Sequence, residues 1–160
     1  MTPVTSRSVE VDRLRKRLYA QLGRVSGFTG DAELMSDYAK YSCVLVSGFL
    51  ECAIYEILLN YIKTKASPGV IRYVESQLSR FTSPTSEKIC GLLGSFDSQW
   101  RSAIESYLVD EKKEAVNSLV GLRHKIAHGE SVGTTFFQIE KYFKEVDKLV
   151  DQIELIVVGN

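Results

Sequence analysis

Apolar residues recur at steps of three and four along almost the whole chain. Between Ser8 and Val25, for example, the apolar positions are Val11, Leu14, Leu18, Leu22 and Val25. This spacing places the apolar side chains on one face of an α-helix, with polar side chains on the other faces. No stretch shows the strict alternation of a half-buried strand, so the pattern predicts an all-α fold, a compact helical bundle.

The same periodicity, together with turn residues, predicts up to seven helices. The expected ranges are 8–25, 31–65, 68–80, 83–93, 98–108, 110–128 and 135–158. Asp31 is suited to cap the second helix, Pro68 to stand in the first turn of the third, and Gly129 to end the sixth in a left-handed conformation. Gly94 is expected to separate the fourth helix from the fifth.

The second predicted helix is the longest and has the most apolar centre. Between Cys43 and Leu59 it is apolar nearly all round, so it should lie at the centre of the bundle. Glu51 and Glu56 interrupt this stretch, which makes it a poor membrane span. With 160 residues, the chain is expected to form a single domain over residues 1–160.

Composition narrows the class of protein without naming a function. Twenty basic and twenty acidic residues cancel, so net charge does not indicate a nucleic-acid binder, although a local basic patch remains compatible. The three cysteines, Cys43, Cys52 and Cys90, lack metal-ligand spacing and are interpreted as reduced thiols of a cytoplasmic protein. No metal site and no cofactor are expected. Early charges such as Glu10 argue against a signal peptide.

The residues suited to chemistry lie together near the end of the sixth predicted helix. The chain's two histidines are His124 and His128, and Arg123 directly precedes the first. Histidine is the usual acid–base group near neutral pH, and arginine is suited to holding phosphate, so the cluster would suit phosphodiester chemistry. Plainer alternatives are a helix cap for His128 and a solvent-facing side chain for His124.

Arg123 also continues an apolar helical stripe, and Glu51 interrupts a similar stripe on the long helix. Because a buried arginine needs a partner, we expect Glu51 and Arg123 to approach each other, directly or through water. Such an ion pair could have a role in the function of the protein, or it could only fix the register of the two helices. On an ideal helix Arg123 and His128 lie about 140° apart. Either the helix ends at His128, or two copies of the helix line one cleft across a two-fold axis.

The segment Arg123-His-Lys-Ile-Ala-His128 resembles the R-x4–6-H motif of HEPN domains, the all-α domains named for higher eukaryotes and prokaryotes nucleotide-binding. The long-helix segment Ser47-Gly-Phe-Leu-Glu51-Cys-Ala-Ile-Tyr55-Glu is similar to the second helix of the RiboL-PSP and MAE_28990-like HEPN groups. The resemblance is strongest over residues 31–158. The periodicity predicts an all-α bundle, and the resemblance implies that this bundle is HEPN-like, with one long central helix.

The resemblance implies a metal-independent endoribonuclease that acts as a homodimer. Arg123 would hold the scissile phosphate of RNA, and His128 would act as general base or acid for attack by the ribose 2′-hydroxyl, leaving a 2′,3′-cyclic phosphate. His124, Glu51 and Ser47 would be accessory. Such domains often serve as toxins or effectors of phage defence, which points to an antitoxin or defence-system protein as a partner. No membrane partner is expected, because Glu51 and Glu56 interrupt the apolar stretch.

Two other hypotheses remain open from the sequence. The chain could be a non-catalytic HEPN-like module that dimerises or binds a partner protein. It could also be a plain helical structural protein in which Arg123 is salt-bridged in the core. The assay that separates the three is RNA cleavage in EDTA by the protein and by its Arg123→Ala and His128→Ala variants.

Overall fold

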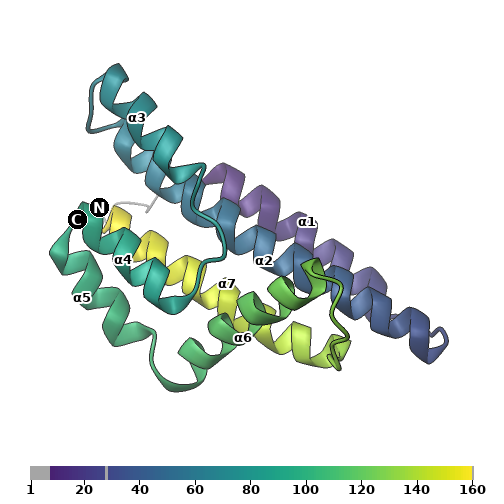
Figure 1. Ribbon diagram of the computed structural model, residues 1–160. Coiled ribbons are helices and arrows are strands. Elements are labelled where there is room, and N and C mark those ends of the chain that lie inside the picture. Colours follow the sequence, from purple (N-terminus) through teal and green to yellow (C-terminus); the bar gives the residue numbers. More distant parts are fainter. Residues whose placement is uncertain (1–7, 28, 160) are drawn as a thin grey trace, which may run out of the picture.

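A computed structural model describes residues 8–27 and 29–159, and within them the chain forms seven α-helices and no strand (Figure 1). The helices are α1 (Val9–Ser26), α2 (Ala32–Lys63), α3 (Pro68–Leu78), α4 (Ser86–Phe96), α5 (Ser98–Tyr107), α6 (Asp110–Ala127) and α7 (Phe136–Val158). The predicted all-α class and the predicted order of helices are therefore confirmed. Helix ends differ from the expected ranges by at most three residues.

Helix α2 is the centre of the bundle, as its apolar sequence predicts. It contacts α1, α3, α6 and α7, and Figure 1 shows it running the length of the molecule. Its inward side chains Leu50, Ile54 and Leu58 are almost completely buried. Burial of each such side chain contributes about 1.5–3 kcal/mol to folding. The position of α2 therefore sets the positions of the helices around it.

Local signals in the sequence set several helix ends. The Asp31 side chain accepts a hydrogen bond from the Leu34 amide at 2.8 Å and caps α2, and Pro68 lies in the first turn of α3. Helix α4 continues to Phe96, beyond the predicted end at Leu93, because Gly94 is part of the helix. A Cβ at that glycine would lie 2.9 Å from Cδ of Arg101, so the missing side chain makes room for α5.

A group of ionic contacts fastens α1 to α7. Nη2 of Arg15 lies 2.7 Å from Asp151, its Nε binds Asp147 at 2.5 Å, and its Nη1 binds Asp12 at 3.0 Å. Tyr19 donates a hydrogen bond to the second oxygen of Asp147 at 2.8 Å. The Arg15 side chain is only 11% exposed, so this arginine joins two helices and does not face the solvent.

One helix among the described residues, α2, has the length and composition to cross a membrane. Within its most apolar window, 61% of the residues are buried inside the protein. The burial accounts for this apolar character, because the central helix of a bundle is covered on most sides.

Candidate functional site at the end of helix α6

Helix α6 ends in a sharply defined turn. Its last helical residue is Ala127, and His128 occupies the C-cap position. Gly129 has a left-handed φ of +70° and donates to the Ile126 carbonyl at 3.1 Å, while Glu130 donates to the Lys125 carbonyl at 3.0 Å. These two bonds form a Schellman motif, the usual end of a helix at a left-handed glycine. The motif fixes the backbone on both sides of His128.

The two histidines share one exposed face at this end. Their imidazole rings lie 4.3 Å apart between centroids, with their planes tilted by 58°. Both residues are exposed, and His128 stands at the C-cap, which are the positions that the plainer alternatives gave the two histidines. The helix does end at His128, as one of the two expected arrangements required. The His128 ring nevertheless lies beside His124, one turn earlier, so ending the helix does not turn this side chain toward Arg123.

Arg123 lies on a different face of α6, directed toward α2. The Cys43 thiol of α2 donates a hydrogen bond to the Leu119 carbonyl at 3.8 Å, which places α2 one turn of α6 away from Arg123. Burial raises the pKa of the Cys43 thiol to about 11, and the positive charge of Arg123 partly opposes this rise. Arg123 is half-buried and forms no ion pair with any other residue in 8–27 or 29–159.

Glu51 has a different partner from the one expected. Its Oε1 accepts a hydrogen bond from the Ser83 amide at 3.1 Å, and Ser83 has a left-handed φ of 53°. No ion pair joins Glu51 to Arg123 in the part of the chain that the structure describes, so the predicted direct contact is wrong. Eight residues separate Cys43 from Glu51, about 12 Å along α2. Arg123 reaches α2 near Cys43, whereas Glu51 stabilises the loop before α4.

Ser47 lies inside the bundle. It is 1% exposed, and its hydroxyl has no hydrogen-bond partner among the described residues. The structure thus places Arg123, His124 and His128 in the last turn of α6, with Arg123 on a different face from the two histidines, and places Ser47 and Glu51 along α2. The sequence pattern predicted a contact between Glu51 and Arg123 because each lies in an apolar stripe of its helix. A stripe shows which face of a helix is buried, but it does not show where along that face another helix crosses.

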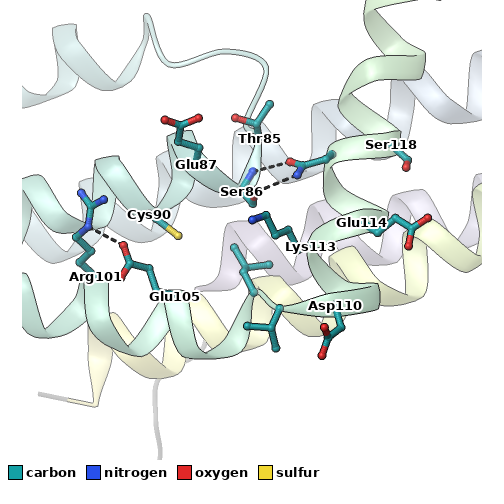
Figure 2. Close-up of a pocket in the computed structure, with 13 residues that line it drawn as sticks. Thr85, Ser86, Glu87, Cys90, Arg101, Glu105, Asp110, Lys113, Glu114 and Ser118 are labelled. Atoms are coloured by element: carbon teal, nitrogen blue, oxygen red, sulfur yellow. Dashed lines mark hydrogen bonds and ion pairs between the residues drawn. The ribbon is translucent and has the colours of Figure 1, made fainter.

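One positioning residue, Asn117, has no signal in the sequence pattern. Its Oδ1 accepts from the Ser86 amide at 2.9 Å, and its Nδ2 donates to the Ser86 hydroxyl at 3.1 Å (Figure 2). This two-bond contact joins α6 to the first turn of α4. A polar residue on a helix surface is ordinary in sequence, so only the packing of α4 on α6 reveals this role.

A cleft of about 1240 Å³ lies between α4, α5 and the beginning of α6 (Figure 2). Its charged side chains carry both signs, and Arg101 is paired with Glu105 at 2.7 Å. Its lining reaches Ser118 in the middle of α6 but includes none of Arg123, His124 and His128. The cleft is therefore distinct from the Arg–His cluster. In the described ranges no three histidine, cysteine or acidic side chains gather in a way that could hold a metal ion.

A second cleft, of about 560 Å³, lies between the end of α6 and the beginning of α7. Its polar lining includes Lys125, Thr135, Gln138 and Tyr142. These residues supply a cation, hydrogen-bonding groups and an aromatic ring. Lys125 belongs to the last turn of α6, as do the two histidines, and the other three residues belong to the N-cap and the first two turns of α7.

Comparison with known proteins identifies the family of the chain. A model of the RiboL-PSP-HEPN family matches residues 7–159. No curated protein and no solved structure matches the chain. The family match spans nearly the whole sequence and includes the long helix, the Arg123–His128 segment and the final helix, so the chain belongs to the RiboL-PSP-HEPN family of all-α HEPN domains.

Proposed function

We propose that this protein is a metal-independent endoribonuclease that works as a homodimer, with its active centre at the end of α6. The observation that carries the proposal is an arginine without an ion-pair partner in the described chain, five residues before an exposed histidine, in a HEPN domain. HEPN domains are often ribonucleases. A cation that is not neutralised by the protein is suited to a phosphate group.

The proposed reaction uses two functions of the site. Arg123 binds the non-bridging oxygens of the scissile phosphate and stabilises the charge that develops on them. His128 removes the proton from the ribose 2′-hydroxyl, whose oxygen attacks phosphorus. The bond from phosphorus to the 5′-oxygen breaks, and that oxygen takes up a proton from an imidazolium. The products are a 2′,3′-cyclic phosphate and a 5′-hydroxyl.

Dimerisation supplies what one subunit lacks. Because Arg123 and His128 lie on different faces of α6, a second copy is needed to bring a guanidinium and two imidazoles around one phosphate. An outward stripe on α2 is suited to this pairing. The stripe contains Leu34, Tyr41 and Val44, which lie on one face of the helix because they are seven and three residues apart. Their exposed fractions are 39%, 54% and 40%, respectively. Gly48, the next position of the stripe, has open space where a Cβ would stand.

This stripe belongs to the stretch of α2 that Arg123 approaches at Cys43. A glycine in the middle of a helix costs about 1 kcal/mol relative to alanine. At Gly48 no contact within the subunit requires the absence of a side chain, which favours close approach of a second helix there. The dimer interface would then border the two Arg–His clusters.

The biological role that follows is that of a toxin or antiviral effector acting on RNA in the cytoplasm. Uncontrolled RNA cleavage harms the cell that makes it, so an antitoxin or other defence-system protein would restrain the enzyme. Both points depend on the ribonuclease activity itself.

The test is incubation of the purified protein with RNA in EDTA, alongside Arg123→Ala and His128→Ala. We expect cleavage by the wild type and a loss of at least 100-fold in each folded variant, in line with removal of a general acid–base or charge-stabilising group. Arg72→Ala is the matched control, because Arg72 is an exposed arginine on α3. A folded dimer that leaves RNA intact at every enzyme concentration would favour a non-catalytic partner-binding module.

A further inference from the structure

We propose that His124 and His128 together bind Zn²⁺, and that the bound ion inhibits RNA cleavage. The zinc-binding part follows from the two histidines of one chain. The inhibition, and completion of the site by a second subunit, rest on the proposed function.

The two imidazoles are placed as a pair of ligands for one ion. They stand one helical turn apart at positions i and i+4, with ring centroids separated by 4.3 Å. A tetrahedral zinc ion with Zn–N bonds of about 2.1 Å holds two nitrogens about 3.4 Å apart. Because the nitrogens lie on the edges of the rings, the observed centroid separation is compatible with two nitrogens at that distance. The Schellman motif at Gly129 fixes the backbone that carries His128.

Both rings are also free to bind. In residues 8–27 and 29–159, neither imidazole forms a hydrogen bond or an ion pair, and both residues are exposed. Zinc binding therefore breaks no interaction of the described structure. Exposure on the last turn of the helix leaves space for water molecules as further ligands.

Two imidazoles make half of a zinc site. Within the described residues no third histidine, cysteine or acidic group completes it. The two-fold axis of the proposed dimer would bring a second pair opposite the first, and four imidazoles complete a tetrahedron. The neighbouring charges of Arg123 and Lys125 oppose a cation, so binding to a single pair is weaker than binding between two subunits.

Inhibition follows from the same nitrogen atoms. A metal ion binds the lone pair of a neutral imidazole nitrogen, which is the lone pair that a general base needs. While zinc occupies His128, that histidine cannot take the proton of a 2′-hydroxyl. EDTA removes the ion and restores cleavage, so a metal-independent enzyme would be controlled by a metal.

The test is calorimetric titration of Zn²⁺ into protein that carries Cys52→Ser, because Cys52 is an exposed thiol and could bind zinc itself. We expect binding to weaken at least tenfold in His124→Asn and in His128→Asn. The matched control is His124→Asn combined with Gly121→His, which keeps two histidines but separates them by seven residues. Gly121 is exposed and has open space for a side chain. This control should stay as weak as His124→Asn.

Unchanged affinity in His124→Asn, or affinity restored by the histidine at position 121, would overturn the proposal. A second readout is the zinc concentration that halves the rate of RNA cleavage by the Cys52→Ser protein and by its His124→Asn variant, each relative to its own zinc-free rate. Titration does not depend on catalysis. Absence of RNA cleavage therefore counts against the proposed function alone, and absence of zinc binding counts against this inference alone.

Discussion

The substitution Glu51→Ala should destabilise the protein through the loop before α4. In the folded protein the Glu51 carboxylate accepts the Ser83 amide at 3.1 Å and holds a residue with a left-handed backbone. A hydrogen bond to a charged group contributes about 1.5–3 kcal/mol. Because Glu51 is only partly buried, we expect about 2 kcal/mol, which corresponds to a fall in Tm of roughly 4–8 °C for a protein of this size.

The assay is unfolding by heat and by guanidinium chloride, followed by circular dichroism. Glu51→Gln keeps an oxygen that can accept the Ser83 amide, so it should lose less than about 1 kcal/mol. Glu56→Ala, on the same helix, removes a carboxylate that forms no hydrogen bond or ion pair in the described chain, and it should change stability by less than about 0.5 kcal/mol.

The same variants test whether Glu51 takes part in chemistry. A role limited to the loop predicts that Glu51→Gln cleaves RNA at a rate near that of the wild type. Loss of cleavage by a variant that unfolds normally would show that the structural role is incomplete. A Glu51→Ala protein as stable as the wild type would refute the reasoning from the Ser83 contact.

Three further predictions concern other parts of the molecule. Arg15→Leu leaves the half-buried Asp147 without its cation and should cost about 2–4 kcal/mol in guanidinium unfolding; a cost below about 0.5 kcal/mol would contradict the role of this contact. The pKa of the Cys43 thiol is about 11 in the folded protein and about 9 in the unfolded chain, so unfolding releases a proton at a pH between 9 and 11. Stability should therefore fall by about 2–3 kcal/mol as pH rises from 9 to 11, and the fall should be smaller in Cys43→Ala. Val44→Arg should shift the protein from dimer to monomer in sedimentation without unfolding it, and a variant that remains dimeric would exclude the outward stripe of α2 as the interface.

Much of the fold could be predicted because its signals are local. The capping side chain of Asp31, the first-turn proline at 68 and the left-handed Gly129 each act on their own helix end, and the structure has all three. The apolar centre of α2 likewise predicts a central helix from its own sequence.

The errors come from contacts between helices. Gly94 breaks no helix; it lies inside α4, and its missing side chain leaves room for Arg101 of α5. Glu51 binds the Ser83 amide on another segment, and nothing in the spacing of α2 indicates that partner. The sequence could predict that Arg123, His124 and His128 lie at the same end of one helix, because these residues are close in the chain.

The most direct test of the central claim uses one RNA oligonucleotide and the same sequence with a single 2′-deoxy nucleotide at the cleaved position, both in EDTA. If Arg123 and His128 direct attack by the 2′-hydroxyl, the RNA yields a 2′,3′-cyclic phosphate and the 2′-deoxy version stays intact at that bond. Equal cleavage of both oligonucleotides, or no cleavage of either by the folded protein, would contradict the account.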